Sequence, residues 1–296
     1  QMIWNKELGE FSKLNITGHI TKGQGYFENY KANVLNEDFN IPDSTIIQDI
    51  VIQRWLDNLF YGAIYSYEYD NDKLNFILGG GVNRYNGKHF GDVIWRSMEI
   101  QDSVQSIIRY YTNQANKTES NTYARFTYNL FDKLYPFADL QYRYVNYNYE
   151  FPSADGGIDV GKDNLHFFNP KVGLSYFPKE QSKLFAYFGI ANREPSRNEY
   201  VNSTEMTRPT YETLYDTELG YEFSGSKFVT NLTLYNMSYN NQLVPIGQLG
   251  DTGEPIRTNV KDSYRRGIEL SMQYAFTRWF KLGYNGTLSQ NKISAF

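Results

Sequence analysis

The chain contains no cysteine among its 296 residues. It therefore has no disulfide framework, no thiolate metal site and no cysteine nucleophile. Histidine is scarce as well: His19, His89 and His166 lie far apart in the sequence. They form no pair at the helical or strand spacing that metal ligands show, so the sequence predicts no metal site, no cofactor and no catalytic residues of this kind.

Long apolar runs are also absent. Charged residues and asparagine interrupt every apolar stretch well before the roughly 18 to 20 residues that a membrane-spanning helix needs. The formal net charge is −4 and both signs are interleaved along the chain, which gives no support to a nucleic-acid partner. Neither a signal peptide nor a lipidation motif starts at Gln1, so we expect any export signal to lie upstream or to have been removed.

Aromatic residues are abundant, with 27 Tyr, 20 Phe and 4 Trp. This composition indicates β structure rather than a soluble α/β enzyme. An outer-membrane β-barrel can look hydrophilic on average, because only alternate residues of each strand face lipid. Tyr and Trp at strand ends would then lie at the lipid headgroups. The alternative is that the rings simply suit half-buried pleated surfaces.

Apolar and polar residues alternate with a period of two in several segments, which is the pattern of strands with one apolar face. In 215–223, apolar or aromatic side chains occupy most odd positions and polar ones the even positions, and 55–69, 138–144, 264–276 and 280–289 show the same alternation. The polar positions carry carboxylates and arginines that suit a hydrated lumen in contact with an interior domain. These predicted inward residues are Asp139, Arg143, Asp216, Glu218, Glu222, Arg265 and Glu269.

The predicted connections alternate between short and long. Short ones fall at 70–72, 131–135, 178–182, 224–227 and 277–279, and long ones at 21–50, 86–106, 151–166, 192–211 and 241–262. Outer-membrane barrels have short periplasmic turns and long outer loops, whereas a globular sandwich has no reason for this sorting. We therefore predict an all-β fold, an antiparallel up-and-down transmembrane β-barrel with 11 to 12 strands in this chain, of which 108–130 forms one.

Three consecutive glycines, Gly79 to Gly81, lie inside the apolar segment between Leu78 and Val82. No helix is predicted after them, so they do not indicate a phosphate-binding loop. We expect them to permit bending of the strand or the close approach of an interior domain.

Several motifs follow one another along nearly the whole chain. After the apolar strand 184–190, residues 193–200 read REPSRNEY. The others are GQGYFENYK at 23–31, RWLDN at 54–58, HFGDVIW at 89–95, FADLQYRY at 137–144, FNPKVGL at 168–174, the segment 212–221, and DSYRRGIE at 262–269. With these motifs in this order, the chain resembles the TonB-dependent outer-membrane receptors, particularly those of Bacteroidetes.

The resemblance implies a plug domain inside a 22-stranded barrel and uptake of a scarce nutrient across the outer membrane of a Gram-negative bacterium, without enzymatic activity. The partners it implies are the TonB-ExbB-ExbD complex, the receptor's own plug domain, outer-membrane lipid and a surface lipoprotein. We expect residues 1–296 to be a fragment of the barrel, with the plug domain and final strands absent. The residues that couple such a receptor to TonB would lie in the missing part.

A ferric siderophore is the expected cargo, and cobalamin, haem or a glycan are the alternatives. The loops contain no His or Met cluster, which argues against direct haem ligation. Two other classes remain open. A barrel enzyme would need His19 or His166 beside an inward serine, and a passive porin or adhesin would need no plug.

Tyr85, His89, Phe90 and Trp95 are candidate ligand-binding residues. They fall together in a predicted outer loop, and rings with polar tips suit the capture of an aromatic or chelate ligand. The alternative is that these rings pack the loop against its neighbours.

Arg193 and Arg197 are the other candidate ligand-binding residues, because a guanidinium fork can bind an anion where a strand leaves the membrane. They alternate with Glu194 and Glu199 in the motif, so the favoured alternative is that these charges pair with one another or with acids of neighbouring strands. Pro195 lacks a backbone donor and is expected to end the strand ladder.

Overall fold

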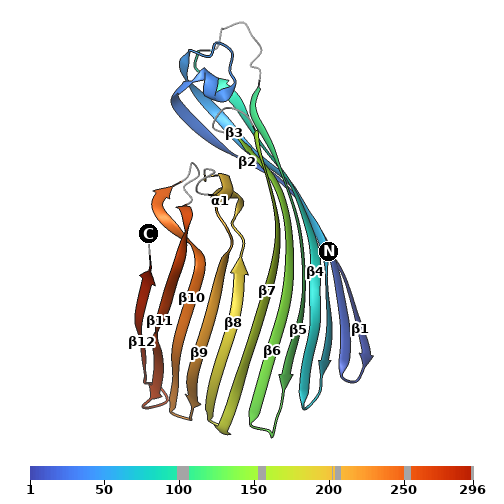
Figure 1. Ribbon diagram of the computed structural model, residues 1–296, viewed down its shortest axis with the longest axis vertical. Coiled ribbons are helices and arrows are strands. Elements are labelled where there is room, and N and C mark those ends of the chain that lie inside the picture. The colour runs from blue at the N-terminus through green and yellow to red at the C-terminus, as the bar shows by residue number, and fades with distance from the viewer. Residues whose placement is uncertain (99–106, 153–157, 202, 204–207, 250–254, 295–296) are drawn as a thin grey trace.

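The computed structural model describes residues 1–98, 107–152, 158–201, 203, 208–249 and 255–294, which form one antiparallel sheet of twelve strands with one 3₁₀ turn and one short helix (Figure 1). The elements are β1 (Met2–Gly9), β2 (Ser12–Leu35), η1 (Asn36–Phe39), β3 (Ile47–Asp70), β4 (Leu74–Arg96), β5 (Ile108–Tyr128), β6 (Leu134–Pro152), β7 (Ile158–Lys179), β8 (Ser182–Arg193), α1 (Arg197–Val201), β9 (Glu212–Ser224), β10 (Phe228–Leu249), β11 (Pro255–Ala275) and β12 (Lys281–Ile293).

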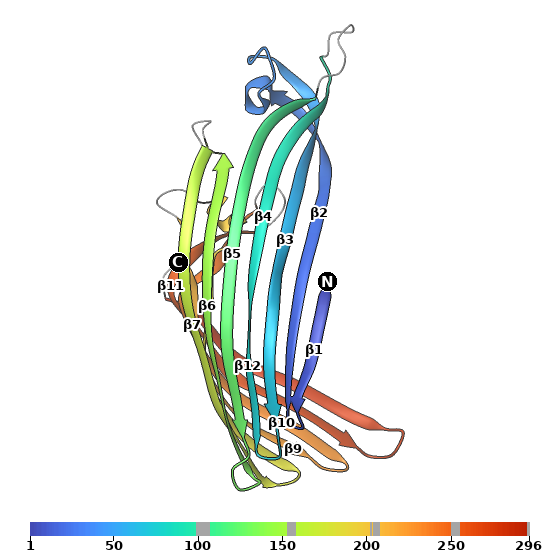
Figure 2. The same cartoon turned by 90° about the vertical axis from the view of Figure 1, so that its right-hand side faces the viewer.

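Each strand pairs with the next one in the sequence, from β1 to β12, so the topology is up-and-down throughout. Figures 1 and 2 show a single curved wall rather than two packed layers. The predicted antiparallel up-and-down β fold is confirmed, and the segment 108–130 forms the single strand β5 as expected. Neither α1 nor any other helix in the described part of the chain has the length and apolarity needed to cross a membrane.

Short turns gather at one end of the wall, the lower end in Figure 1. Residues 71–73, 180–181 and 225–227 connect strands there. The turn after β3 is fixed by Asn71, whose side-chain oxygen accepts hydrogen bonds from the backbone N–H groups of Lys73 and Leu74 at 3.0 and 2.7 Å. The predicted sorting of short turns to one end is therefore confirmed.

The long connections differ from the prediction because strands continue into them. β2 runs to Leu35 and β3 begins at Ile47, so pairing covers most of the predicted loop 21–50. β4 likewise extends to Arg96. In these extensions, the backbone N–H and C=O groups of the two strands still pair with each other. Polar side chains on both faces of the ribbon are compatible with this pairing, because both faces meet solvent. The rest of these predicted loops includes 99–106, 153–157, 202, 204–207 and 250–254, which lie outside the described residues.

The two faces of the wall differ in polarity. Along β9, odd-numbered side chains are mostly the more exposed ones, and Leu219 is 52% exposed. Leu184 and Ile268, on the same face of β8 and β11, are also exposed. The opposite face carries α1, which contacts both β6 and β11 although these strands are not neighbours. A helix can reach both strands only across the inside of the curve, so the exposed apolar face is the convex one.

Ion pairs occupy the concave face. The predicted inward residues Asp139 and Glu222 lie there, and each is paired with a cation of a neighbouring strand. The pairs are Arg125–Asp139 at 2.8 Å, Lys183–Glu222 at 3.1 Å and Lys13–Glu68 at 2.8 Å. A polar concave face behind an apolar convex face is the arrangement of a barrel that surrounds a hydrated lumen.

Buried apolar clusters occur toward the loop end of the wall. One of them packs η1 against the extended ribbons and contains Ile41, Ile50, Ile52 and Val93. The other contains Ala115, Tyr149 and Tyr200 and lies beneath α1. The second cluster positions the segment that follows β8.

The glycine run in β4 makes room for a tyrosine ring. A Cβ atom at Gly79 would lie 2.6 Å from the ring of Tyr123, so that ring fills the space above the glycine. We expect Gly79→Ala to lower the free energy of unfolding by about 1 to 3 kcal/mol through overpacking. Urea titration in detergent micelles measures this, and Gly23→Ala is the matched control, since nothing lies within 4 Å of its Cβ position. Equal losses in the two variants would contradict the packing role.

Candidate functional site

The segment after β8 turns into the concave face and begins α1. Pro195 ends the ladder because it has no backbone N–H. Ser196 and Glu199 then form a capping box: the Ser196 N–H donates to the Glu199 carboxylate at 2.6 Å, and the Glu199 N–H donates to Ser196 Oγ at 3.4 Å. These contacts explain why REPSRNEY leaves the strand and starts a helix.

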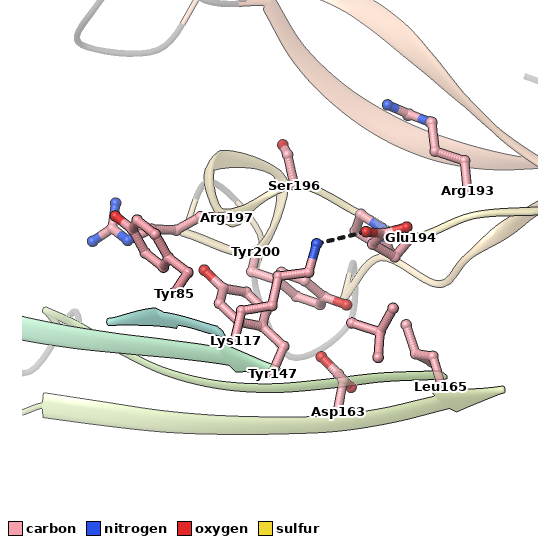
Figure 3. Close-up of a pocket in the computed structure, with 12 residues that line it drawn as sticks. Tyr85, Lys117, Tyr147, Asp163, Leu165, Arg193, Glu194, Ser196, Arg197 and Tyr200 are labelled. Atoms are coloured by element: carbon pink, nitrogen blue, oxygen red, sulfur yellow. Dashed lines mark hydrogen bonds and ion pairs between the residues drawn. The ribbon is translucent and has the colours of Figure 1, made fainter. Parts of the chain in front are cut away.

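Charged side chains of β5 and β6 fasten this segment to the wall through Glu194, and Figure 3 shows one of these contacts, from Lys117 to Glu194. The Glu194 carboxylate accepts hydrogen bonds from Lys117 Nζ at 2.7 Å and from Arg143 Nη1 and Nη2 at 2.7 and 2.6 Å. Arg143 Nε also donates to Glu119 at 2.7 Å. Burial alone would raise the pKa of Glu194, but the hydrogen bonds from Arg143 and Lys117 outweigh it and lower that pKa to about 2. Glu194 is therefore ionised at neutral pH.

Arg193 is held by acids on two sides. Its Nη2 atom lies 3.1 Å from Glu199 and its Nε atom 3.0 Å from Glu212. The favoured prediction that the motif supplies its own partners is thus right for Arg193 and Glu199. It is wrong for Glu194, whose partners come from β5 and β6. Arg193 therefore has a structural role through its Nε and Nη2 atoms, while its side chain remains 44% exposed and lines the cavity described below.

Tyrosine rings form the floor beneath α1. Tyr200 stacks on Tyr149 with ring centroids 4.6 Å apart, and Tyr147 lies 4.8 Å from Tyr149. The hydroxyl of Tyr149 donates to Asp163 at 3.2 Å and accepts from Arg208 at 3.0 Å. Tyr147, Tyr200 and the carboxylate of Asp163 therefore line the space on the concave side.

A cavity of about 330 Å³ lies between this floor and the segment after β8 (Figure 3). Its lining includes Tyr85, Tyr147 and Arg197, and Figure 3 shows the Arg197 side chain directed toward Tyr85. The Tyr85 hydroxyl donates to Asn58 at 2.8 Å. The buried Nε atom of Arg197 has no hydrogen-bond partner among the described residues, and no described carboxylate forms an ion pair with this arginine.

The charge of Arg197 acts on the titratable groups around it. Burial, together with the smaller effect of the Arg197 charge, lowers the pKa of His89 to about 4. Burial raises the pKa of Tyr147 to about 12, and Arg197 opposes that rise. At neutral pH the site therefore presents one uncompensated guanidinium beside neutral imidazole and phenol groups. This arrangement suits an anionic ligand with aromatic or hydroxyl groups.

The candidate residues of β4 do not share a loop. Because successive residues of a strand face opposite sides, Tyr85 and His89 face the cavity side whereas Phe90 faces the convex side. Phe90 stacks on Trp55 with centroids 5.8 Å apart and lies under Arg109. Trp95 is exposed near the end of β4. The expectation that the four residues sit together in an outer loop is wrong.

Sequence reasoning missed part of the site. Lys117, Tyr147 and Tyr200 line the cavity, but none of them was a candidate. The alternation along β5 and β6 could have placed Lys117 and Tyr147 on the same face as Arg143. No pattern in the sequence indicates that Tyr200 folds back from α1 onto that face.

Lowering the pH is expected to destabilise the protein through His89. The unfolded chain takes up a proton near pH 6.5, whereas the folded protein keeps His89 neutral down to about pH 4. Stability that is fully present above pH 6.5 is therefore lost as the pH falls toward 4, by about 2 to 3 kcal/mol. Urea titrations of wild type and His89→Gln at pH 7.5 and 4.5 measure this. An identical pH dependence in both proteins would contradict the shifted pKa.

Metal ligands do not gather at the site. Within the described ranges, no group of three or more His, Asp or Glu side chains lies close enough to hold a metal ion.

Comparison with known proteins finds one family. A family profile described as "TonB dependent receptor-like, beta-barrel" matches residues 4–294. No curated protein sequence matches the chain.

Solved structures of similar fold include several transporters and receptors. The copper transporter OprC is 14% identical, with 99% of this chain and 45% of that chain covered and a TM-score of 0.74. The siderophore receptor PiuA from Acinetobacter baumannii is 12% identical over 99% of this chain and 46% of that one, with a TM-score of 0.68. The unliganded ferric citrate transporter FecA is 12% identical over 99% and 42%, with a TM-score of 0.65. The chain spans less than half the length of each, and at these identities the likeness shows the fold.

Proposed function

The chain belongs to the TonB-dependent receptor family, whose β-barrel profile it matches over residues 4–294, and from this membership we propose that it acts in active transport across the outer membrane. In this proposal, the twelve strands form part of a larger barrel that holds a plug domain supplied by the rest of the receptor. The ligand binds on the concave side near the loop end, and energy from TonB opens a path for it through the barrel lumen.

The convex face supports a location in the outer membrane of a Gram-negative bacterium. It exposes large apolar side chains such as Leu219 across many strands, while the concave face carries ion pairs. Members of this family are outer-membrane proteins that contain a plug and work with TonB. For this receptor we propose the TonB-ExbB-ExbD complex, its own plug, outer-membrane lipid and a surface lipoprotein as partners.

We propose a ferric siderophore as the cargo. The observation that carries this proposal is Arg197, an arginine without a described carboxylate partner, whose side chain is directed toward Tyr85 in a cavity that Tyr147 and Tyr200 also line. Many ferric siderophores combine net negative charge with ring or hydroxyl groups, and the chelator rather than the protein would hold the iron. Arg197 and Tyr85 would contact such a ligand, and neutral His89 would lie next to them.

The other cargoes and classes are less well supported. Cobalamin, haem and glycans remain alternatives with the same transport mechanism. The enzyme alternative needs a histidine beside an inward serine, but His166 lies on the convex face and pairs with Tyr142 at 2.6 Å. His19 lies on the concave face, where its ring packs 5.1 Å from that of Phe60.

Iron uptake by cells tests the proposed function. The complete receptor is expressed in a Gram-negative host that lacks its own siderophore receptors, and radioactive iron is supplied on a panel of anionic and neutral siderophores. We expect saturable uptake of an anionic chelate that stops when the host loses TonB. Growth on cobalamin, haem or a glycan without iron uptake would contradict the cargo. Uptake that does not need TonB would contradict the mechanism and favour a porin, and labelling by a serine-reactive fluorophosphonate would favour an enzyme.

A further inference from the structure

Three aromatic rings on the concave face of β6 and β8 lie flat against the wall, between the candidate site and the short-turn end. A Cβ atom at Gly173 would clash with the ring of Phe137, and one at Gly220 with the ring of Phe185, so both rings extend across a neighbouring strand. Aromatic side chains that cover glycines of a sheet lie along it. Tyr187 lies beside Phe137, with ring centroids 6.2 Å apart and an angle of 11° between the rings. We call these three rings the ring strip.

Positive charge is left over beside the ring strip. Lys171 of β7 lies directly opposite Asp139 of β6, but the Asp139 carboxylate accepts hydrogen bonds from Arg125 Nε and Nη2 at 3.0 and 2.8 Å. Lys171 is half-buried and forms no ion pair with any described residue. Two cations and one carboxylate therefore give this part of the concave face one excess positive charge.

The adjoining part of the concave face, on β9 to β11, is acidic. Asp216 and Glu218 of β9 and Glu269 of β11 face the lumen, and none of them forms an ion pair within the ranges that the structure describes. The strand register places Asp216 in the same row as Lys171, with one residue of β8 between them. Arg265 is also in this row, and its guanidinium lies 5.5 Å from the centroid of the Tyr239 ring. Three carboxylates and one guanidinium leave an excess of negative charge.

A hollow of about 830 Å³ lies at the lower end of the ring strip, toward the short turns in Figure 1. Tyr135 and Phe177 line it, with ring centroids 5.4 Å apart. Lys183 lines it too, and its Nζ atom lies 5.2 Å from the centroid of the Phe185 ring. The turns add two lysines and two acids to the lining, which are Lys133, Lys179, Asp132 and Glu180. The hollow continues the ring surface to the short-turn end of the wall.

Neutral amides connect the candidate site to the ring strip. Gln141 of β6 and Asn169 of β7 face the lumen between the tyrosine floor and Lys171. The Asn169 amide donates to Gln141 at 3.0 Å, and the Asn192 amide donates to Asn169 at 2.8 Å. On this face of β6 to β8, Asp139 with its Arg125 partner is the single carboxylate between the floor and the hollow. An anion therefore meets no unpaired acid on these strands.

The two parts of the wall act differently on a charged ligand. β7 and β9 are roughly 10 Å apart, which is about one screening length at physiological salt, so each part acts mainly on a ligand close to it. Low-dielectric walls concentrate these fields inside a lumen. An anion is stabilised near Lys171 and repelled near Glu218 and Glu269, and a ligand with rings also gains contact with the ring strip.

We propose that the anionic ferric chelate moves from the candidate site to the short-turn end along β6 to β8, over the ring strip, and not along β9 to β11. This inference rests on the proposed transport function and adds the route to it. Lys171 contacts the anionic groups of the passing chelate, and Phe137 and Tyr187 contact its rings. The hollow beside Lys183 is the last binding site before release.

Charge-selective labelling tests the two sides of the lumen without cargo. Ser175 of β7 and Thr233 of β10 are half-buried lumen positions in one row of the register, and each is replaced by cysteine in the complete, otherwise cysteine-free receptor in vesicles. An anionic and a cationic methanethiosulfonate of similar size then label each cysteine. The ratio of the two rates cancels differences in thiol reactivity. We expect the anionic-to-cationic ratio to be at least roughly tenfold higher at 175 than at 233.

Uptake kinetics test the route itself. Lys171→Gln should lower the maximal rate of TonB-dependent uptake of the anionic chelate at least roughly threefold, because it removes the excess charge beside the path. Its surface binding to de-energised cells should not change, and Lys171→Arg should restore the rate. Arg265→Gln is the matched control, since it removes one positive charge from the same row on the acidic side and should not lower the rate.

The outcomes separate the route from the proposed function. Equal labelling ratios at 175 and 233 would overturn the route, as would equal effects of Lys171→Gln and Arg265→Gln on uptake. Weaker surface binding in Lys171→Gln would place this lysine at the capture step and also contradict the route. Gel mobility before and after heating verifies that the variants fold. Absence of uptake in the wild type, with the expected labelling ratios, would count against the proposed function alone.

Discussion

The Arg197→Ala variant of the complete receptor is expected to bind its ferric siderophore roughly 100-fold more weakly than wild type, a loss of about 2.7 kcal/mol. The reason is that no described carboxylate pairs with Arg197, so a bound anion would be its main charged partner. Removing the guanidinium leaves the anionic ligand beside His89 and Tyr147. Both side chains are neutral at pH 7, because the pKa of His89 is lowered to about 4 and that of Tyr147 is raised to about 12.

Fluorescence titration of the purified receptor with ferric siderophore measures this loss. Arg266→Ala is the matched control, because it removes the same charge from an exposed position on the convex face. The affinity of Arg197→Lys should lie between those of alanine and wild type, since lysine keeps the charge but not the planar fork. Unchanged affinity in Arg197→Ala would show that the ligand binds elsewhere.

The Arg143→Ala variant is expected to lose about 2 to 4 kcal/mol of stability, the second large effect. Arg143 holds Glu194 through two hydrogen bonds and Glu119 through a third, and the exposed fractions of its side chain and that of Glu194 are 19% and 16%. Without Arg143, Lys117 remains the partner of Glu194, so two half-buried carboxylates share one ammonium group. The segment after β8 should then detach from the wall and expose the tyrosine floor.

Urea titration of the complete receptor measures the stability change, and quenching of tyrosine fluorescence by iodide reports exposure of the floor. Lys13→Ala is the control, because the Lys13–Glu68 pair is exposed and such pairs contribute about 0 to 1 kcal/mol. A loss in Arg143→Ala no larger than in the control would contradict the anchoring role of the network.

The fold could be predicted because apolar and polar residues alternate in strand after strand, as one apolar and one polar face require. The alternation in 215–223 and 264–276 identified which side chains share a face, and the structure places Leu219 and Ile268 on the convex face accordingly. The ends of the strands could not be predicted equally well. Beyond the apolar band, both faces of a ribbon meet solvent, so pairing continues from Lys22 to Leu35 without leaving an alternating pattern.

The site was harder to predict for two reasons. It depends on which face of β4 each residue occupies, and it depends on the segment after β8 turning back onto the concave face. Treating 85–95 as a loop made Tyr85, His89, Phe90 and Trp95 appear equivalent, whereas a strand separates His89 from Phe90. The REPSRNEY motif was identified, but its balanced charges suggested pairing within the motif. The partners of Glu194 come from strands more than fifty residues earlier in the chain, which no local pattern indicates.

Attaching a fluorescent probe to single cysteines along β9 tests the central claim most directly. The chain has no cysteine of its own, so each of positions 215–223 can carry one probe in an otherwise cysteine-free receptor in vesicles. If β9 is a membrane-spanning wall of a barrel, a lipid-bound quencher reaches probes at the odd positions, such as 219, and a water-soluble quencher reaches those at the even positions, such as 218. Uniform quenching along the strand, or lipid contact at the even positions, would contradict it.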